Sequence, residues 1–280
     1  MRGQAPPRRP ARLRDQGEPG PARLKAVDVE PPVVVGVDVA AARPCVAVAA
    51  RGGRRLEALD WLEAPADDAG GRALLADWVH RWRPAAVAVD APQGLRRPRA
   101  GSGDRACDAA LRAAGLPVYR VPDRGQAAAL GPRHWMAVGR ELFALLRGRR
   151  YGYEPPPAGG SPPVLAPAPA LLEVYPHASF AALLGGVPPA KGTRRGQWAR
   201  VRLLRACGVA WDEFFDHDSL DALVAALTAW RFLTGQACAL GDEREGLVWL
   251  PVTAAAFAAA RPYRRLDGPG LAARLAALGA

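Results

Sequence analysis

The stretch Val33-Val34-Val35-Gly36-Val37-Asp38 decides how this chain folds. Its apolar run is typical of a strand that is buried on both faces of a sheet. The stretch ends in a carboxylate, and burial of a carboxylate costs free energy unless a cation or hydrogen-bond donors compensate it. A second stretch of the same design, Ala86-Val87-Ala88-Val89-Asp90, follows downstream. The two stretches predict buried strands whose acidic ends lie together.

The segments around these stretches predict a mixed sheet. After Val33–Asp38, we expect strands over Cys45–Ala50 and Leu56–Leu62, and the short loops between them make an antiparallel meander. Apolar residues at helical spacing predict a helix over Asp68–Arg83. The strand Val87–Asp90 then returns through that helix, so a right-handed crossover should place it parallel to the first strand.

The rest of the chain adds helices and two more strands. Further helices are expected over Asp104–Ala114, Trp135–Arg147, Ala178–Leu184, Gly196–Cys207 and Asp218 to about Leu233, and strands over Ala170–Tyr175 and Gly246–Leu250. This order is that of the ribonuclease-H-like fold, an α/β architecture of three antiparallel strands, then parallel strands, with flanking helices. We expect a disordered basic Arg/Pro-rich tail over 1–30, a ribonuclease-H-like domain over 31–255 with a Pro/Gly-rich insert at about 153–169, and a C-terminal helical extension over 256–280.

Composition restricts the class of protein. The chain has 280 residues, of which 50% are hydrophobic, enough for one large α/β domain or two small ones. No apolar run is long enough to span a bilayer, and the N-terminus lacks a secretory signal. The net charge of +11 suits a polyanion such as nucleic acid, although a coding bias towards arginine would also produce it. The four cysteines lack CxxC spacing, which argues against a zinc site or a disulfide framework and indicates a reducing, cytoplasmic location.

A second pair of carboxylates lies far downstream. Asp218 and Asp221 are one helical turn apart and share a face of the last long helix. With Asp38 and Asp90 they would form a cluster that holds Mg²⁺ or Mn²⁺ for phosphoryl chemistry. Three of the four have a simpler alternative: Asp218 as a helix N-cap, Asp38 as a turn residue after a strand, and Asp90 as an Asx turn before Pro92. These alternatives do not explain all four together.

Other polar residues are weaker candidates. Glu173 interrupts an apolar strand, so it is either a fifth acidic ligand or a residue that faces solvent or pairs with an arginine. Lys191 and Arg200 lie in a Gly-rich basic stretch that is either a phosphate-binding segment or a solvated loop. His177 and His217 are notable for their proximity to the carboxylates. GxSxG, HExxH and P-loop motifs are missing from the sequence.

Several short motifs in order resemble one known family, the DUF429 family of predicted ribonuclease-H-like nucleases. They span roughly Val33 to Val252 and are Gly36–Asp38, Ala88–Leu95, Arg105–Asp108, Glu173–Pro176, Lys191–Thr193, Asp218–Ala222 and Gly246–Pro251. One departure is Val39, where the family tends to carry a small residue after the first aspartate.

The resemblance implies a metal-dependent nuclease. It implies that Asp38 and Asp90 bind metal from adjacent strands and that Asp221 or Asp218 completes the site from the last helix. Our first hypothesis is therefore a Mg²⁺- or Mn²⁺-dependent nuclease that acts on DNA or RNA. The alternatives are a non-catalytic nucleic-acid-binding or regulatory protein with this fold and, third, a kinase-like ATPase of the same superfamily, since fold alone does not decide function. The sequence leaves the oligomeric state open, with a homodimer as one option.

Overall fold

The computed structural model describes residues 30–66, 68–97, 103–152, 169–212 and 216–279. The chain divides into two units, Met1–Glu30 and Pro31–Ala280, and the description below concerns the second. The predicted basic tail and nearly all of the Pro/Gly-rich insert lie outside the described residues. None of the helices in the described ranges is long and apolar enough to cross a membrane.

The described part of the chain forms one mixed sheet of eight strands in the order β6-β3-β2-β1-β4-β5-β8-β7. The strands are β1 Val33–Asp38, β2 Cys45–Arg51, β3 Leu56–Ala64, β4 Ala86–Asp90, β5 Ala170–Val174, β6 Val209–Ala210, β7 Cys238–Asp242 and β8 Gly246–Leu250. Strands β1, β2 and β3 pair antiparallel, whereas β1, β4, β5 and β8 pair parallel in that order. This arrangement confirms the predicted mixed α/β sheet and is compatible with a ribonuclease-H-like fold.

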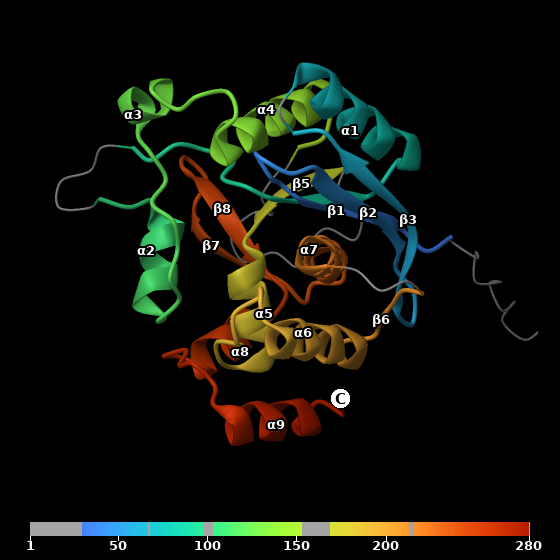
Figure 1. Ribbon diagram of the computed structural model, residues 1–280, viewed down its shortest axis with the longest axis vertical. Helices are drawn as coiled ribbons and strands as arrows, with labels where there is room; N and C mark the ends of the chain where they lie inside the picture. The colour runs from blue at the N-terminus through green and yellow to red at the C-terminus, as the bar shows by residue number, and fades with distance from the viewer. Residues whose placement is uncertain (1–29, 67, 98–102, 153–168, 213–215, 280) are drawn as a thin grey trace, which may run out of the picture. The chain divides into compact units, whose positions relative to one another are not determined.

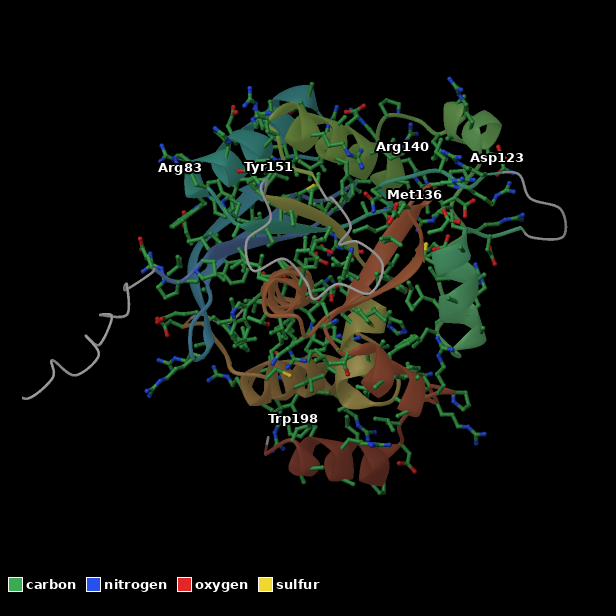
Figure 2. The ribbon with its side chains drawn as sticks, turned by 180° about the vertical axis from the view of Figure 1, so that it is seen from behind. Arg83, Asp123, Met136, Arg140, Tyr151 and Trp198 are labelled. Atoms are coloured by element: carbon green, nitrogen blue, oxygen red, sulfur yellow. The ribbon has the colours of Figure 1, made fainter. Side chains whose placement is uncertain are left out.

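Helices cover both faces of the sheet (Figure 1). They are α1 Ala69–Trp82, α2 Ala106–Ala113, α3 Arg124–Ala128, α4 Trp135–Gly148, α5 Pro176–Leu184, α6 Arg194–Ala206, α7 His217–Leu233, α8 Ala254–Ala259 and α9 Gly268–Ala277. Helix α7 packs on one face, against β1, β2 and β4, and α1 and α4 pack on the other. Helix α6 lies against α7 and carries the exposed side chain of Trp198 (Figure 2).

The alternation of side chains along β1 assigns each residue to one of these faces. Val34 belongs to the apolar core under α7, whereas Val35 and Val37 belong to the core under α1 and α4. Gly36 and Asp38 therefore face α7. A Cβ atom at Gly36 would lie 2.1 Å from the carbonyl oxygen of Ala222, so only glycine permits α7 to approach the sheet this closely.

The structure also differs from the sequence-based expectation. The short strand β6, the edge strand β7 and the helix α3 were not predicted, because each is too short or too polar to give a clear periodic pattern. The alternative that Asp218 caps the last helix is wrong. The N-cap is Asp216, whose carboxylate accepts hydrogen bonds from the backbone N–H groups of Asp218 and Ser219, so the side chain of Asp218 is left for another role.

Candidate metal centre

Two neighbouring parallel strands bring the first pair of carboxylates together. Asp38 pairs with Asp90 in the register of β1 and β4. Ala86 and Ala88 belong to the core under α7, so Asp90, which follows them at the same two-residue period, points to that face as Asp38 does. Both side chains therefore emerge at the carboxyl ends of their strands, beneath the first turn of α7.

Helix α7 supplies the second pair. Carboxylate oxygens of Asp38, Asp218 and Asp221 all lie within 4.8 Å of one another, and Asp90 lies beside Asp38 in the next strand. Asp38, Asp218 and Asp221 are almost completely buried, with relative exposures of 4%, 3% and 3%. We refer to Asp38, Asp90, Asp218 and Asp221 as the acidic cluster. Residues that are far apart in the sequence, near the beginning and the end of the domain, therefore lie together in the structure.

Burial and mutual repulsion raise the pKa values in this cluster. Burial, followed by the negative charges of Asp90 and Asp221, holds the pKa of Asp38 well above its ordinary value. Burial and the charge of Asp221 raise the pKa of Asp90 to about 8, although Lys191 and a hydrogen bond with Asp38 act in the other direction. Burial also raises the pKa of Asp221, and Lys191 opposes this effect. The ionised cluster therefore lacks sufficient positive charge around it.

Two basic side chains supply part of that charge. The ammonium nitrogen of Lys191 lies 2.5 Å from Oδ2 of Asp221 and 3.8 Å from Oδ1 of Asp218. Burial alone would lower the pKa of Lys191, but Asp221, Asp38 and Asp218 together raise it. Arg43 forms an ion pair with Asp218 through both terminal nitrogens. Its side chain is 54% exposed, so this pairing is open to solvent and readily rearranged.

His217 and Asp216 border the cluster from the helix N-terminus. Nδ1 of His217 lies 2.7 Å from Oδ1 of Asp218 but makes no hydrogen bond there. Together with Asp218 these two residues form a second group of possible metal ligands. Asp216 is exposed and already caps α7, whereas the group of Asp38, Asp218 and Asp221 is buried. The buried group is therefore the stronger candidate for a metal ion.

Arg200 borders the same cavity, but the structure gives it a mainly internal set of contacts. Its Nη1 donates to the carbonyl oxygens of Pro189 and Gly196 at 2.9 Å and 3.0 Å, and its guanidinium stacks over the ring of Phe180. Burial lowers its pKa, while Asp221 acts in the opposite direction. These contacts hold the turn between Pro189 and Gly196, which contains Lys191, next to the acidic cluster.

Glu173 lies on the other face of the sheet. Leu172 and Val174 face α7, so Glu173 between them points away from the acidic cluster. Arg105 binds both of its oxygens, with Nη2 2.6 Å from Oε1 and Nη1 3.0 Å from Oε2. The backbone N–H of Gln93 donates a further hydrogen bond of 2.9 Å. The structure therefore brings Asp38, Asp90, Asp218 and Asp221 together and directs Glu173 to an arginine, one of the alternatives considered for it.

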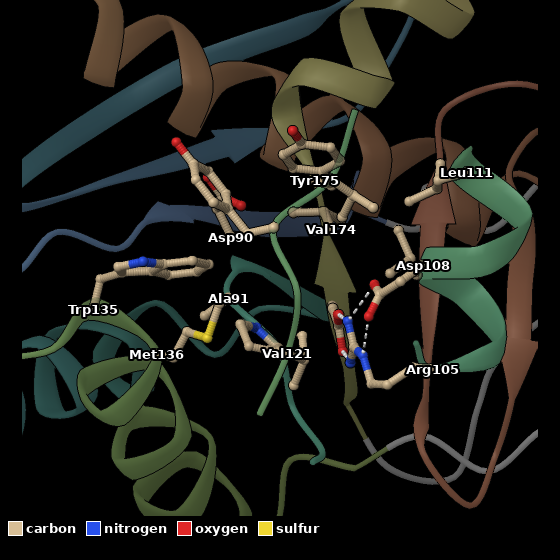
Figure 3. Close-up of a pocket in the computed structure, with 15 residues that line it drawn as sticks. Asp90, Ala91, Arg105, Asp108, Leu111, Val121, Trp135, Met136, Val174 and Tyr175 are labelled. Carbon is tan, nitrogen blue, oxygen red and sulfur yellow. Dashed lines mark hydrogen bonds and ion pairs between the residues drawn. The ribbon is translucent and has the colours of Figure 1, made fainter. Parts of the chain in front are cut away.

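The acidic cluster opens into a cavity of about 520 Å³. Its lining includes all four aspartates, Lys191, Arg200 and His177, and on another side three aromatic rings, those of Tyr119, Trp135 and Tyr175. Burial, then the positive charges of Arg200 and Lys191, lower the pKa of His177 to about 4, so this imidazole stays neutral. A smaller pocket of about 30 Å³ adjoins the cavity and shares Asp90 with it (Figure 3).

These residues fit a divalent metal ion. Carboxylate oxygens are the ligands that Mg²⁺ and Mn²⁺ prefer, and a bound cation would offset both the burial and the mutual repulsion that raise the pKa values of Asp38 and Asp90. A soft metal is a poor match, because the described residues of the cluster offer no cysteine and only His217 at the margin. The buried acidic residues could therefore hold a metal ion.

Sequence reasoning did not identify several residues of the site. Arg43 lies in the loop after β1, Tyr119 lies in the connection between α2 and α3, and Trp135 is the first residue of α4. Neither spacing nor periodicity links them to the aspartates. The one available signal was the aromatic side chain of Tyr119 in a segment with no predicted helix or strand, since aromatic residues outside the core often mark binding surfaces.

Comparison with known proteins adds the family. The model of the family described as "Protein of unknown function (DUF429)" matches residues 36–245, a range that contains every aspartate of the acidic cluster. Neither the curated proteins nor the solved structures contain a significant match to the chain.

Proposed function

The chain belongs to the DUF429 family, and from its acidic cluster we propose that it is a divalent-metal-dependent nuclease that hydrolyses phosphodiester bonds of nucleic acid. The observation that carries this proposal is the convergence of three buried carboxylates, with oxygens within 4.8 Å of one another, on an open cavity. Four acidic side chains with two paired basic ones among the described residues leave a deficit of positive charge that suits a metal ion.

Asp38, Asp218 and Asp221 would hold Mg²⁺ or Mn²⁺, with Asp90 as the neighbouring ligand. A bound divalent ion supplies Lewis-acid stabilisation of the charge that develops on a phosphoryl group and an activated water at neutral pH. The side chains of Lys191 and Arg43 are 44% and 54% exposed at the cavity, so they can also contact the phosphates of a substrate.

A basic surface beside the cavity supports nucleic acid as the partner. Helix α6 begins just after Lys191, carries five arginines and contains no acidic residue. Arg194, Arg195 and Arg205 are exposed, and the guanidinium of Arg202 stacks over the exposed ring of Trp198. Such a surface attracts a phosphate backbone without reading its sequence. The four cysteines are free, which supports a reducing, cytoplasmic location.

A second candidate function is non-catalytic binding of nucleic acid. It is favoured by the ion pair between Lys191 and Asp221, because an internal cation on a carboxylate is an alternative to a metal ion. The two functions differ in whether Asp38 is needed for bond cleavage.

The decisive experiment compares cleavage of labelled single-stranded, duplex and branched DNA and RNA in Mg²⁺, Mn²⁺ or EDTA. We expect wild type to cut only with metal and Asp38→Asn to lose at least about 100-fold in rate, since the lost interaction stabilises transition-state charge by several kcal/mol. Asp60→Asn, an exposed aspartate on β3, is the matched control and should cut as wild type does. Equal cleavage by wild type and Asp38→Asn, or cleavage in EDTA, would overturn the nuclease proposal.

A further inference from the structure

Three aromatic side chains from separate parts of the fold border the acidic cavity. Tyr119 lies in the connection between α2 and α3, Trp135 is the first residue of α4, and Tyr175 is the residue between β5 and α5. All three line the cavity that contains the acidic cluster. We call them the aromatic wall.

Part of the ring surface of the aromatic wall faces solvent, while Trp135 and Tyr175 also pack against the apolar core. Tyr119 is 69% exposed and meets only the edge of Trp135, with ring centroids 5.9 Å apart. Trp135 is itself half-buried and is backed by His134, whose ring stacks against it at 6.2 Å. The hydroxyl of Tyr175 donates to the carbonyl of Pro117 at 2.8 Å, which fixes the direction of that ring. The rings are therefore held in place while part of their surface stays uncovered.

The aromatic wall lies next to the carboxylates of the acidic cluster, so a group that stacks on it would be close to the candidate metal site. Trp135 and Tyr175 lie on either side of Asp90 (Figure 3), so a group stacked there is adjacent to the acidic cluster. The cavity of about 520 Å³ is within the range that holds a small ligand. A second groove of about 440 Å³ shares Ala41, Ala42 and Arg43 with the cavity and adds Arg133, which continues the basic lining away from the site.

We infer that the aromatic wall is a subsite for an unpaired nucleobase, so that the substrate class is single-stranded nucleic acid or an unpaired nucleotide within a structured one. In a duplex each base face is covered by its neighbours, whereas an unpaired base offers a free face to an aromatic side chain. Stacking of such a base on the wall would place its phosphate at the acidic cluster and the following phosphates along Arg43 and Arg133. This inference names the substrate of the proposed nuclease and therefore rests on that function.

The test measures binding rather than cleavage and uses the full-length Asp38→Asn protein. Fluorescein-labelled oligo-dT and a blunt, fully paired DNA duplex of equal phosphate number are titrated by anisotropy. We expect at least tenfold tighter binding of oligo-dT. Adding Tyr119→Ala or Trp135→Ala should weaken oligo-dT binding about 5- to 100-fold, the range found for stacked bases, and leave duplex binding unchanged. Trp135→Phe should retain most of the affinity, because an aromatic face remains.

Controls separate stacking from folding and from charge. Leu74→Ala removes an exposed apolar side chain outside the cavity, 48% exposed on α1, and should leave the affinity for oligo-dT and for the duplex unchanged. Melting temperatures of all variants verify that they are folded. Equal affinity for both probes, a parallel loss of both in Tyr119→Ala and Trp135→Ala, or no binding at all would overturn the inference. The proposed function fails separately, if Asp38→Asn cuts as wild type does, whatever the binding preference.

Discussion

Two buried acidic groups lie at the carboxyl ends of the central strands, on opposite faces of the sheet, and they differ in how their charge is compensated. In the acidic cluster, Lys191 and Arg43 reach Asp221 and Asp218 from half-exposed positions. In the second group, which we call the Arg105 cluster, Arg105 is 2% exposed and contacts both oxygens of Asp108 and both oxygens of Glu173.

Backbone donors complete the Arg105 cluster. Glu245 accepts hydrogen bonds from the N–H groups of Arg97 and Ala106 at 2.8 Å and 3.0 Å, and Glu173 accepts one from Gln93. The pocket beside this cluster has a volume of only about 30 Å³, against about 520 Å³ beside the acidic cluster. Buried carboxylates are thus tolerated in a fold where the protein supplies their partners, and they form a candidate binding site where it leaves part of the compensation to be supplied from outside.

The largest effect is expected from removal of Arg105, the buried cation of the Arg105 cluster. Arg105→Ala leaves Asp108 and Glu173 buried without their partner, so it should lower the free energy of unfolding by about 3–5 kcal/mol with or without metal. Urea unfolding measures this change. Arg112→Ala, which removes an exposed ion pair with Asp104, is the control and should cost less than about 1 kcal/mol. A similar small cost for both variants would contradict the distinction between the two clusters.

The close approach of α7 to β1 is the next target. In Gly36→Ala the new methyl group would lie 2.1 Å from the carbonyl oxygen of Ala222 and 2.3 Å from the backbone nitrogen of Ala226. We expect a loss of about 1–3 kcal/mol in stability together with weaker Mn²⁺ binding, because the displaced helix carries Asp218 and Asp221. Gly148→Ala, with open space around its Cβ, should change neither quantity. Normal Mn²⁺ binding by Gly36→Ala would show that helix position does not define the site.

The sequence carried enough information for six of the eight strands and for the convergence of the acidic cluster, because both depend on local patterns. The apolar runs ending in Asp38 and Asp90 have the strand period, and the helix crossover between them implies a parallel pair. In the structure, the small residues Ala222 and Ala226 lie where α7 approaches Gly36 of the sheet. These three features together bring the aspartates into one place.

The remaining parts of the site depend on tertiary packing that no local pattern encodes. The pairing of Glu173 with Arg105 follows from its place in the strand alternation, which becomes clear only once the face covered by α7 is known. The contact of Arg43 with Asp218 and the position of Tyr119 at the cavity depend on loop conformations, and that of Trp135 depends on how α4 packs against the core. Loops have no hydrophobic periodicity, so their side chains cannot be placed from sequence.

In the absence of metal, the pH dependence of protein stability should distinguish the acidic cluster from the Arg105 cluster. The folded pKa of Asp90 is raised from 3.8 to about 8 by burial and by Asp221, so its ionisation opposes folding. This penalty is zero below the unfolded pKa, grows as the pH rises, and is complete above the folded pKa. In EDTA, Asp90→Asn should therefore melt a few degrees above wild type at pH 8, with a smaller gain at pH 5. A gain that is equal at both pH values would mean that Asp90 does not ionise in this range.

The smallest effect is expected at Lys191, whose ammonium group occupies Asp221 where a metal ion would bind. Lys191→Met removes this competitor and leaves the acidic cluster more negative, so the apparent affinity for Mn²⁺ should rise about three- to tenfold in calorimetry. Lys191→Arg keeps the charge and should remain close to wild type. The Arg105 cluster has no counterpart to this exchange, because Arg105 is buried and bound by two carboxylates, whereas the side chain of Lys191 is 44% exposed. Weaker Mn²⁺ binding by Lys191→Met would show instead that Lys191 organises the carboxylates, which would make the two clusters alike.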